Sequence, residues 1–253
     1  MKNFPIFSLL VFFTVLSCQS KKKLKTSFAH IAETKRQYET LRPDSLRYYF
    51  SLFEKAMAPR GADKIIALSY DGISVADNRK IHTHYYHQRR KGFWVKINYS
   101  GQNIYPLVFT TEKQIKWNGQ AYESLSDEEK KHLMPLQYSD WLFLPFYLYN
   151  NQFEFRKISR VQDIDGRSVW GFYAGYKKHK FHFYFDKKHK FLIRLEKLSP
   201  AGNIDFSIDF MDFRPVNGNY LAHYWIYRNR ASNTTTKFIW KKIKINYIET
   251  LKF

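Results

Sequence analysis

The fold is decided by residues 93–120, whose sequence is FWVKINYSGQNIYPLVFTTEKQIKWNGQ. Aromatic and β-branched residues fill three short runs of this stretch, at 93–99, 105–110 and 114–117. Ser100-Gly101 follows the first run and Asn118-Gly119 follows the third, and Asn-Gly is a strong signal for a tight hairpin turn. The stretch therefore predicts a meander of short antiparallel strands.

The same pattern continues on both sides of this stretch. Further strands are predicted at 64–70, 81–87, 154–161, 168–173, 180–186, 192–198, 204–214, 223–230 and 234–247. Turns are expected at Asp71-Gly72 and Gly175, among other places. Aromatic residues make up 19% of the chain, which suits half-buried pleated surfaces. The chain is therefore predicted to be α+β and mostly β, with one strongly curved antiparallel sheet.

Residues 28–57 are the best helical region. Apolar residues recur there at helical spacing, and the chain is interrupted around Pro43, with Asp44 or Ser45 as the expected N-cap of a second helix. Pro59 and Gly61 would end this helix. Two interpretations stay open, an ordinary core-packing helix and a helix that plugs the mouth of the curved sheet.

Residues 126–149 break the strand pattern. Ser126 followed by Glu129 predicts a capped helix start, and Met134-Pro135 would interrupt that helix. The run 141–149 is intensely apolar and aromatic, and Pro145 prevents one continuous helix. Such a run belongs in a core, along a cavity, or in a flap that touches a membrane.

The first 17 residues predict a secretory signal peptide of the lipoprotein type. Lys2 precedes an apolar run that ends at Cys18, and a polar, basic segment follows. The end of the run has the form of a bacterial lipobox, so Cys18 is expected to become the lipidated N-terminus. Residues 18–27 would then be a short basic linker and residues 28–253 a single domain. Cys18 is the only cysteine, so no internal disulfide is expected.

The formal net charge is +20. A basic surface can meet nucleic acid, acidic polymers or anionic lipid headgroups. An exported protein meets little nucleic acid, which leaves anionic membrane surfaces as the sharper interpretation. A simply solvated lysine-rich surface is the alternative.

We find no known catalytic motif in the sequence. His82 and His84 would share one face of a strand and His87 the other, which is too few convergent ligands for zinc. Residues 163–166 resemble the first residues of a calcium-binding loop but are better interpreted as a β-turn. His179, His182 and His189 are interpreted as solvated or hairpin-end residues. We therefore predict no catalytic residue, no metal site and no cofactor.

Three stretches resemble the LolA/LolB-like outer-membrane lipoprotein carrier superfamily, and especially its outer-membrane lipoprotein-sorting-like proteins. They are residues 113–129, with a strand ending in Trp117, a turn, a return strand and a capped helix; residues 164–196; and the hairpin at 212–223. The resemblance implies a half-open barrel with helices across its concave face and acyl chains held in an aromatic-lined cavity. The cavity candidates are Phe50, Phe53, Trp94, Trp117, Trp141, Phe143 and Phe146.

The resemblance and the signal together imply a non-catalytic lipoprotein of a Gram-negative cell envelope. Its expected partners are the membrane, through the N-terminal lipid, a lipid or acyl ligand, and other envelope proteins, but not nucleic acid. The residues after Cys18 lack an aspartate or acidic cluster, which by resemblance favours the periplasmic face of the outer membrane. An envelope scaffold with a filled barrel and an envelope-polymer hydrolase are the alternative functions.

Overall fold

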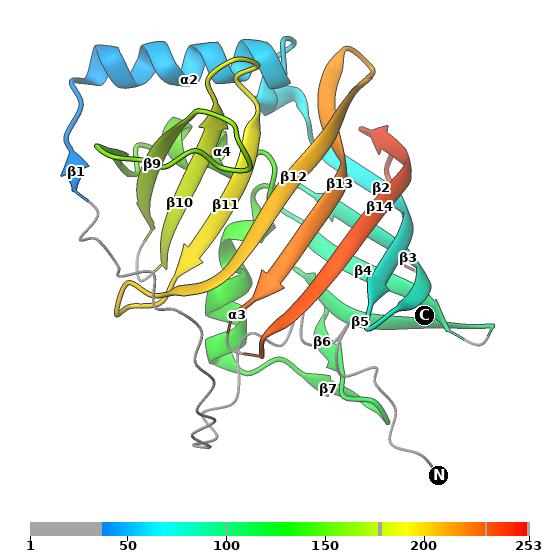
Figure 1. Ribbon diagram of the computed structural model, residues 1–253. Coiled ribbons are helices and arrows are strands. Elements are labelled where there is room, and N and C mark those ends of the chain that lie inside the picture. Colours follow the sequence, from blue (N-terminus) through cyan, green and yellow to red (C-terminus); the bar gives the residue numbers. More distant parts are fainter. Residues whose placement is uncertain (1–36, 100, 177–178, 231, 252–253) are drawn as a thin grey trace.

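The computed structural model describes residues 37–99, 101–176, 179–230 and 232–251. The predicted signal peptide, Cys18, the linker and the first part of the predicted helical region lie outside the described residues. Fourteen strands of the described part form one antiparallel sheet in the order β1-β8-β9-β10-β11-β12-β13-β14-β2-β3-β4-β5-β6-β7 (Figure 1). The strands are β1 (Tyr38–Glu39), β2 (Ala67–Ala76), β3 (Arg79–Gln88), β4 (Gly92–Tyr99), β5 (Gln102–Thr110), β6 (Gln114–Trp117), β7 (Tyr122–Ser124), β8 (Glu154–Ile158), β9 (Val169–Tyr176), β10 (His179–Asp186), β11 (Leu192–Leu198), β12 (Ile204–Val216), β13 (Asn219–Asn229) and β14 (Thr234–Ile245).

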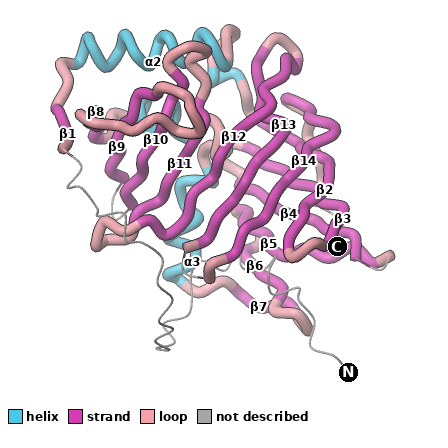
Figure 2. The backbone as a smooth tube through the Cα atoms, viewed as in Figure 1, coloured by secondary structure: helices cyan, strands magenta, loops and turns pink. Residues whose placement is uncertain are grey.

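The sheet is strongly bent and not closed, because β1 and β7 end it on opposite sides. Figure 1 shows helix α2 (Pro43–Met57) across one end of the strands. Helices α3 (Asp127–Leu133) and α4 (Leu144–Asn150) lie on the concave side, joined through the 3-10 helix η2 (Met134–Gln137). A second 3-10 helix, η1 (Ala62–Lys64), leads into β2. The predicted fold class, a mostly β half-open barrel with helices across the concave face, is confirmed (Figure 2).

The core follows from the period of two along each strand. In β10, Phe181, Phe183 and Phe185 point to the concave side and belong to the main core. The residues between them, His182 and Tyr184, face the convex side. The same alternation in the other strands lines the concave face with aromatic and aliphatic side chains, which pack against α2 and α4.

The predicted turn at Asp71-Gly72 is wrong, because both residues lie inside β2. Gly72 is needed there for close approach, since a Cβ atom on it would lie 2.1 Å from the carbonyl oxygen of Ile239 in β14. The chain turns instead at Asp77 and Asn78, whose φ angles of 47° and 60° suit a hairpin turn. Gly175, also expected in a turn, lies within β9.

The first helical region differs from the prediction in two ways. Tyr38 and Glu39 form β1, which pairs with β8, so this part is not helical. The N-cap of α2 is Arg42 and neither Asp44 nor Ser45, because Pro43 occupies the first turn, where its missing N–H costs nothing. Asp44 lies in that first turn, where its negative charge interacts favourably with the positive end of the helix dipole.

The predicted start of α3 is confirmed in full. The hydroxyl of Ser126 accepts a hydrogen bond from the backbone N–H of Glu129 at 3.2 Å, and Glu129 accepts one from the N–H of Ser126 at 2.7 Å. This is a complete capping box. Glu129 is also paired with Lys116 in β6 at 2.8 Å, which fixes α3 against the sheet.

The convex face carries two smaller apolar clusters and the end of the chain. One cluster groups Tyr86, Trp94, Tyr105 and neighbours, with Leu251 packed against it. Glu249 binds the hydroxyl of Ser69 at 2.5 Å and Nε2 of His84 at 2.8 Å. The C-terminal segment therefore covers the outside of β2 and β3. In the described part of the chain, no helix has both the length and the apolar character needed to cross a membrane.

Candidate functional site

Aromatic rings fill the concave side beneath α2. Phe53 of the helix stacks on Phe185 of β10, with ring centroids 3.8 Å apart and planes 3° from parallel. Phe50 stacks on Tyr149 of α4 at 4.3 Å and meets Phe155 of β8 edge-on at 4.9 Å. Both helical phenylalanines are buried. This end of the half-barrel is therefore closed by contact between α2, α4 and the sheet.

The structure brings together five of the seven predicted cavity residues. Phe50, Phe53, Phe143 and Phe146 belong to the main core, and Trp141 packs against it. Phe143 and Phe146 come from the start of α4, where Pro145 takes a first-turn position. We call residues 127–150, which contain α3, η2 and α4, the cover segment.

Trp94 does not join this group. It lies in β4 between Phe93 and Val95, which both point into the main core. Because neighbouring residues of a strand face opposite sides, the ring of Trp94 lies on the convex face. It contacts His84 there at 5.0 Å and Tyr86 at 5.3 Å between centroids.

Trp117 also lies apart from the main core. It ends β6, near the free edge of the sheet, and is only half-buried. Its ring meets Tyr122 of β7 edge-on at 4.9 Å. Its Nε1 is buried and has no hydrogen-bond partner in the described part of the chain.

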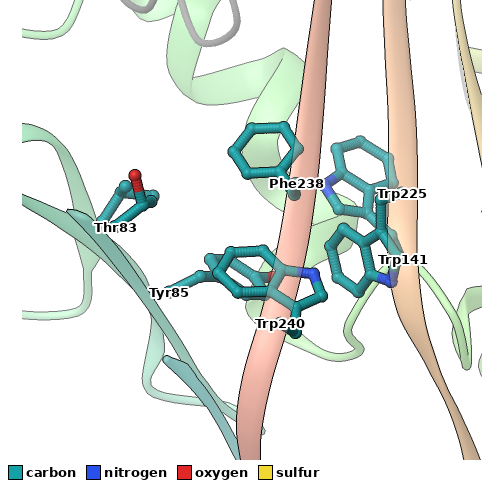
Figure 3. Close-up of a pocket in the computed structure, with 7 residues that line it drawn as sticks. Thr83, Tyr85, Trp141, Trp225, Phe238 and Trp240 are labelled. Carbon is teal, nitrogen blue, oxygen red and sulfur yellow. The ribbon is translucent and has the colours of Figure 1, made fainter. Parts of the chain in front are cut away.

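A small cavity lies between the cover segment and strands β3, β4, β13 and β14. Its volume is about 10 Å³, about the room of one water molecule. Figure 3 shows rings from these strands and from the cover segment turned toward this common space. The lining residues are Thr83, Tyr85, Val95, Trp141, Trp225, Phe238 and Trp240. Only Trp141 among them was predicted, although the alternating aromatic residues of β13 and β14 are a signal that could have found Trp225 and Trp240.

Next to this cavity lies a buried carboxyl group with two tyrosines. Asp140 is 2% exposed, and its Oδ1 accepts a hydrogen bond from the N–H of Leu142 at 2.9 Å. The other oxygen, Oδ2, and the hydroxyls of Tyr70 and Tyr85 are also buried. Both hydroxyls lie within reach of the Asp140 carboxyl group, and hydrogen bonding from them favours its charged form. Burial raises the pKa of Asp140 to about 6. Burial first, and then the charge of Asp140, raise the pKa of both tyrosines.

The cover segment is tied to the sheet by a buried histidine. Nε2 of His87 in β3 donates a hydrogen bond to the carbonyl oxygen of Leu136 in η2 at 2.8 Å. Burial lowers the pKa of His87 to about 4, so it is neutral at pH 7. The backbone N–H of Arg90 also donates to the carbonyl of Gln137 at 2.6 Å.

Of the other histidines, His179 is buried at the start of β10 beside Phe181, and His82 and His84 lie on the convex side. His82 and His84 share that face, as predicted, and both contact Asp71, at 3.1 and 3.5 Å. The prediction for His182 is wrong, because it is buried and its Nδ1 lies 3.2 Å from Glu196. His189 is exposed at a hairpin end, as predicted, and residues 163–166 form the predicted turn. Within the described ranges, no group of three or more His, Cys, Asp or Glu residues is placed to hold a metal ion.

Comparison with solved structures supports the fold. The structure is similar to a putative outer membrane lipoprotein-sorting protein domain from Vibrio parahaemolyticus, with a TM-score of 0.50, 8% identity, and coverage of 79% of this chain and 91% of that one. It is equally similar to a LolA superfamily protein from Nitrosomonas europaea, with a TM-score of 0.50, 10% identity, and coverage of 80% and 94%. A DUF1329 family protein from Desulfovibrio piger matches with a TM-score of 0.51, 6% identity, and coverage of 81% and 94%. No family model matches the sequence, and no curated protein matches it significantly. The LolA-like fold expected from the sequence resemblance is therefore confirmed.

Proposed function

We propose that this protein is a lipid-anchored, non-catalytic component of a Gram-negative cell envelope, and that it binds lipid or lipoprotein acyl chains on its concave face. One observation carries the proposal: a continuous aromatic face is covered by short helices and not closed by strands. The outer-membrane lipoprotein-sorting fold supports the same assignment. Anchoring at Cys18, facing the periplasm from the outer membrane, would place this face beside its ligand.

An acyl chain enters only if the cover segment moves. The cavity of about 10 Å³ has the room of about one water, far less than an acyl chain needs. Helices α3 and α4 have seven residues each, too few for a helix to be stable without packing. The hydrogen bond from His87 to the Leu136 carbonyl is one of the contacts that hold the cover segment on the sheet. Displacing this segment would expose Phe143, Phe146 and the rings beneath them.

The alternative function is an envelope scaffold that takes no small ligand. The observation in its favour is the dense ring packing under α2, where Phe53 and Phe185 stack at 3.8 Å. In that case the cover segment would be a permanent part of the core.

Photo-crosslinking in membranes separates the two functions. The full chain would carry p-benzoylphenylalanine in place of Phe143, whose side chain faces the core from the cover segment, or, as the matched control, in place of Trp94 on the convex face. We expect mass spectrometry to find acyl chains attached at position 143 and few or none at position 94. Equal labelling at both positions, or none at 143, would contradict acyl binding on the concave face and favour the scaffold.

A further inference from the structure

The convex face of the sheet carries a row of lysines along β14, which lies between β13 and β2 (Figure 1). Phe238, Trp240 and Ile243 of this strand belong to the main core, so the residues between them face the convex side. A register shift between Trp240 and Lys242 leaves two consecutive lysines exposed, where regular alternation would turn one of them inward. The lysines of this row are Lys237, Lys241, Lys242 and Lys244.

These lysines have no acidic partners. Among the described residues, no Asp or Glu side chain forms an ion pair with any of the four. Asp71 of β2 lies opposite Lys242 in register, but its carboxylate contacts His82 and His84 instead, at 3.1 and 3.5 Å. Glu249 of the C-terminal segment is also paired with His84, at 2.8 Å. The row is therefore a surface of uncompensated positive charge.

Protection of a sheet edge does not explain the row. Lysines on edge strands prevent the sheet from pairing with other chains. In this protein the sheet ends at β1 and β7, and β14 has a hydrogen-bonded strand on each side. The positive charge therefore lies in the middle of the convex face, where a flat partner can meet several lysines together.

Apolar side chains lie between the lysines. Ile239 is 43% exposed although it belongs to a central strand, and Lys237 precedes it by one turn of the pleat on the same face. Their cross-strand neighbours, which share this face and are half-buried, are Tyr224 and Ile226 of β13 and Ile73 and Val75 of β2. Lysine stems lie along apolar surface while their ammonium groups reach beyond it. Such a surface suits an anionic bilayer, because apolar groups enter the headgroup boundary and ammonium groups meet the phosphates.

The side chains of this surface favour a bilayer over nucleic acid. Proteins that bind single-stranded nucleic acid stack its bases on exposed aromatic rings. Here the side chains around Ile239 are aliphatic, apart from the half-buried Tyr224. The lipid expected at Cys18 would also hold the protein beside a bilayer, where anionic headgroups attract lysines within a Debye length of about 8 Å.

We propose that the convex face of β13, β14 and β2 docks the protein on the anionic lipid headgroups of the bilayer that holds its anchor. The four lysines of β14 meet the phosphates, and Ile239 enters the headgroup boundary. This inference rests on the lipid anchoring of the proposed function and not on acyl binding. Docking in this orientation keeps the cover segment and the concave face clear of the bilayer, so the cover segment can move.

The test is photo-crosslinking of the mature protein, isolated from its membranes and reconstituted in vesicles of phosphatidylcholine with or without phosphatidylglycerol. It would carry p-benzoylphenylalanine in place of Ile239 or, as the matched control, in place of Tyr48, which is 62% exposed on the outer side of α2. In the vesicles with phosphatidylglycerol, we expect at least tenfold more lipid attached at position 239 than at position 48. In phosphatidylcholine alone, or in 1 M sodium chloride, labelling at position 239 should fall to the level of the control.

A pair of charge variants tests the row itself. Lys237→Gln together with Lys242→Gln should lower the ratio of docked to undocked protein about 25-fold, since each lysine near an anionic surface contributes about fivefold. Lys187→Gln together with Lys188→Gln removes the same charge from the exposed hairpin between β10 and β11 and should leave the ratio unchanged. Circular dichroism checks that both double variants are folded.

Three outcomes would overturn the inference. The first is equal lipid labelling at positions 239 and 48, or at position 239 with and without phosphatidylglycerol. The second is an equal loss in the two double variants, which would mean that net charge and not this face attracts the lipid. The third is crosslinking of position 239 to a protein instead of lipid in isolated cell membranes. Failure of the anchor shows separately, as protein missing from the phosphatidylcholine vesicles, and failure of acyl binding shows at Phe143.

Discussion

At the scale of single residues, two buried titratable groups hold the cover segment with opposite pH dependence. Oδ1 of Asp140 accepts a hydrogen bond from the backbone N–H of Leu142, and burial raises the pKa of Asp140 to about 6. His87 donates to Leu136, and its pKa is lowered to about 4. Burial is the first cause of both shifts, since it disfavours the charged form of each group.

The signs of the two effects follow from proton linkage. From pH 4 to 6 the folded state keeps a proton on Asp140 that the unfolded state has lost, so this group lowers stability as pH rises. Below pH 6.5 the unfolded state binds a proton on His87 that the folded state does not, so this group lowers stability as pH falls. Each effect is worth up to about 3 kcal/mol, and over pH 4 to 6 they oppose each other.

We therefore predict that substituting either group leaves the effect of the other group visible in the pH dependence of the free energy of unfolding. Asp140→Asn should gain stability relative to the wild type as pH rises from 4 to 6. His87→Gln, which keeps a donor for the Leu136 carbonyl, should gain relative to the wild type as pH falls from 6.5 to 4. Chemical denaturation at pH 4, 5, 6 and 7 measures both differences, and pH-independent differences would contradict the assigned pKa shifts.

At the scale of elements, the cover segment is the part of the structure that has to move in the proposed function. Helix α3 has a complete capping box at Ser126 and an ion pair from Glu129 to Lys116. Helix α4 starts at Leu144, with Pro145 in its first turn and no side-chain cap. These local contacts, with the packing of α4, decide how easily the concave face opens. The cover segment is thus held by these polar contacts together with the burial of its apolar side chains in the main core.

Removing the cap should loosen α3. Ser126→Ala leaves the N–H of Glu129 without its acceptor, which costs about 1 kcal/mol. Hydrogen exchange of the α3 amides should speed up about fivefold, the rate ratio of that free energy. Ser124→Ala, on an exposed strand residue two positions earlier, is the matched control and should leave α3 unchanged. Equal exchange in both variants would show that α3 does not depend on this cap.

At the scale of the whole molecule, the proposed function joins an acyl-binding half-barrel to a lipid anchor. The net charge of +20 supports a position beside anionic headgroups. In the proposed function, displacement of the cover segment from the open sheet gives a ligand a route to the concave face that a closed barrel would not provide.

The anchor has its own test in living cells. Cys18→Ser removes the thiol that would carry the lipid, so labelled palmitate should no longer be incorporated and the protein should leave the membrane fraction. Ser20→Ala, two residues further on, should keep both. A Cys18→Ser protein that still carries the label and stays with the membrane would show that the anchor lies elsewhere.

Local sequence was enough for much of the fold. The bounds of β6 and β11, the capping box at Ser126 and the turn at Asp165 and Gly166 are set by interactions within a few residues. Local reasoning failed at Gly72, where the glycine serves a contact with Ile239, more than 160 residues away. It also placed Trp94 on the wrong face, because the residues around it did not show which side of β4 would be buried.

The sequence by itself determined a curved antiparallel meander and the helix start at Ser126, because alternation and turn chemistry act over neighbouring residues. It also predicts an export signal ending at Cys18. Tertiary structure alone decided which rings face one another and that Asp140 lies beside Tyr70 and Tyr85. Tyr70 and Tyr85 lie opposite each other in β2 and β3, and the packing of the cover segment against the sheet brings Asp140 to them.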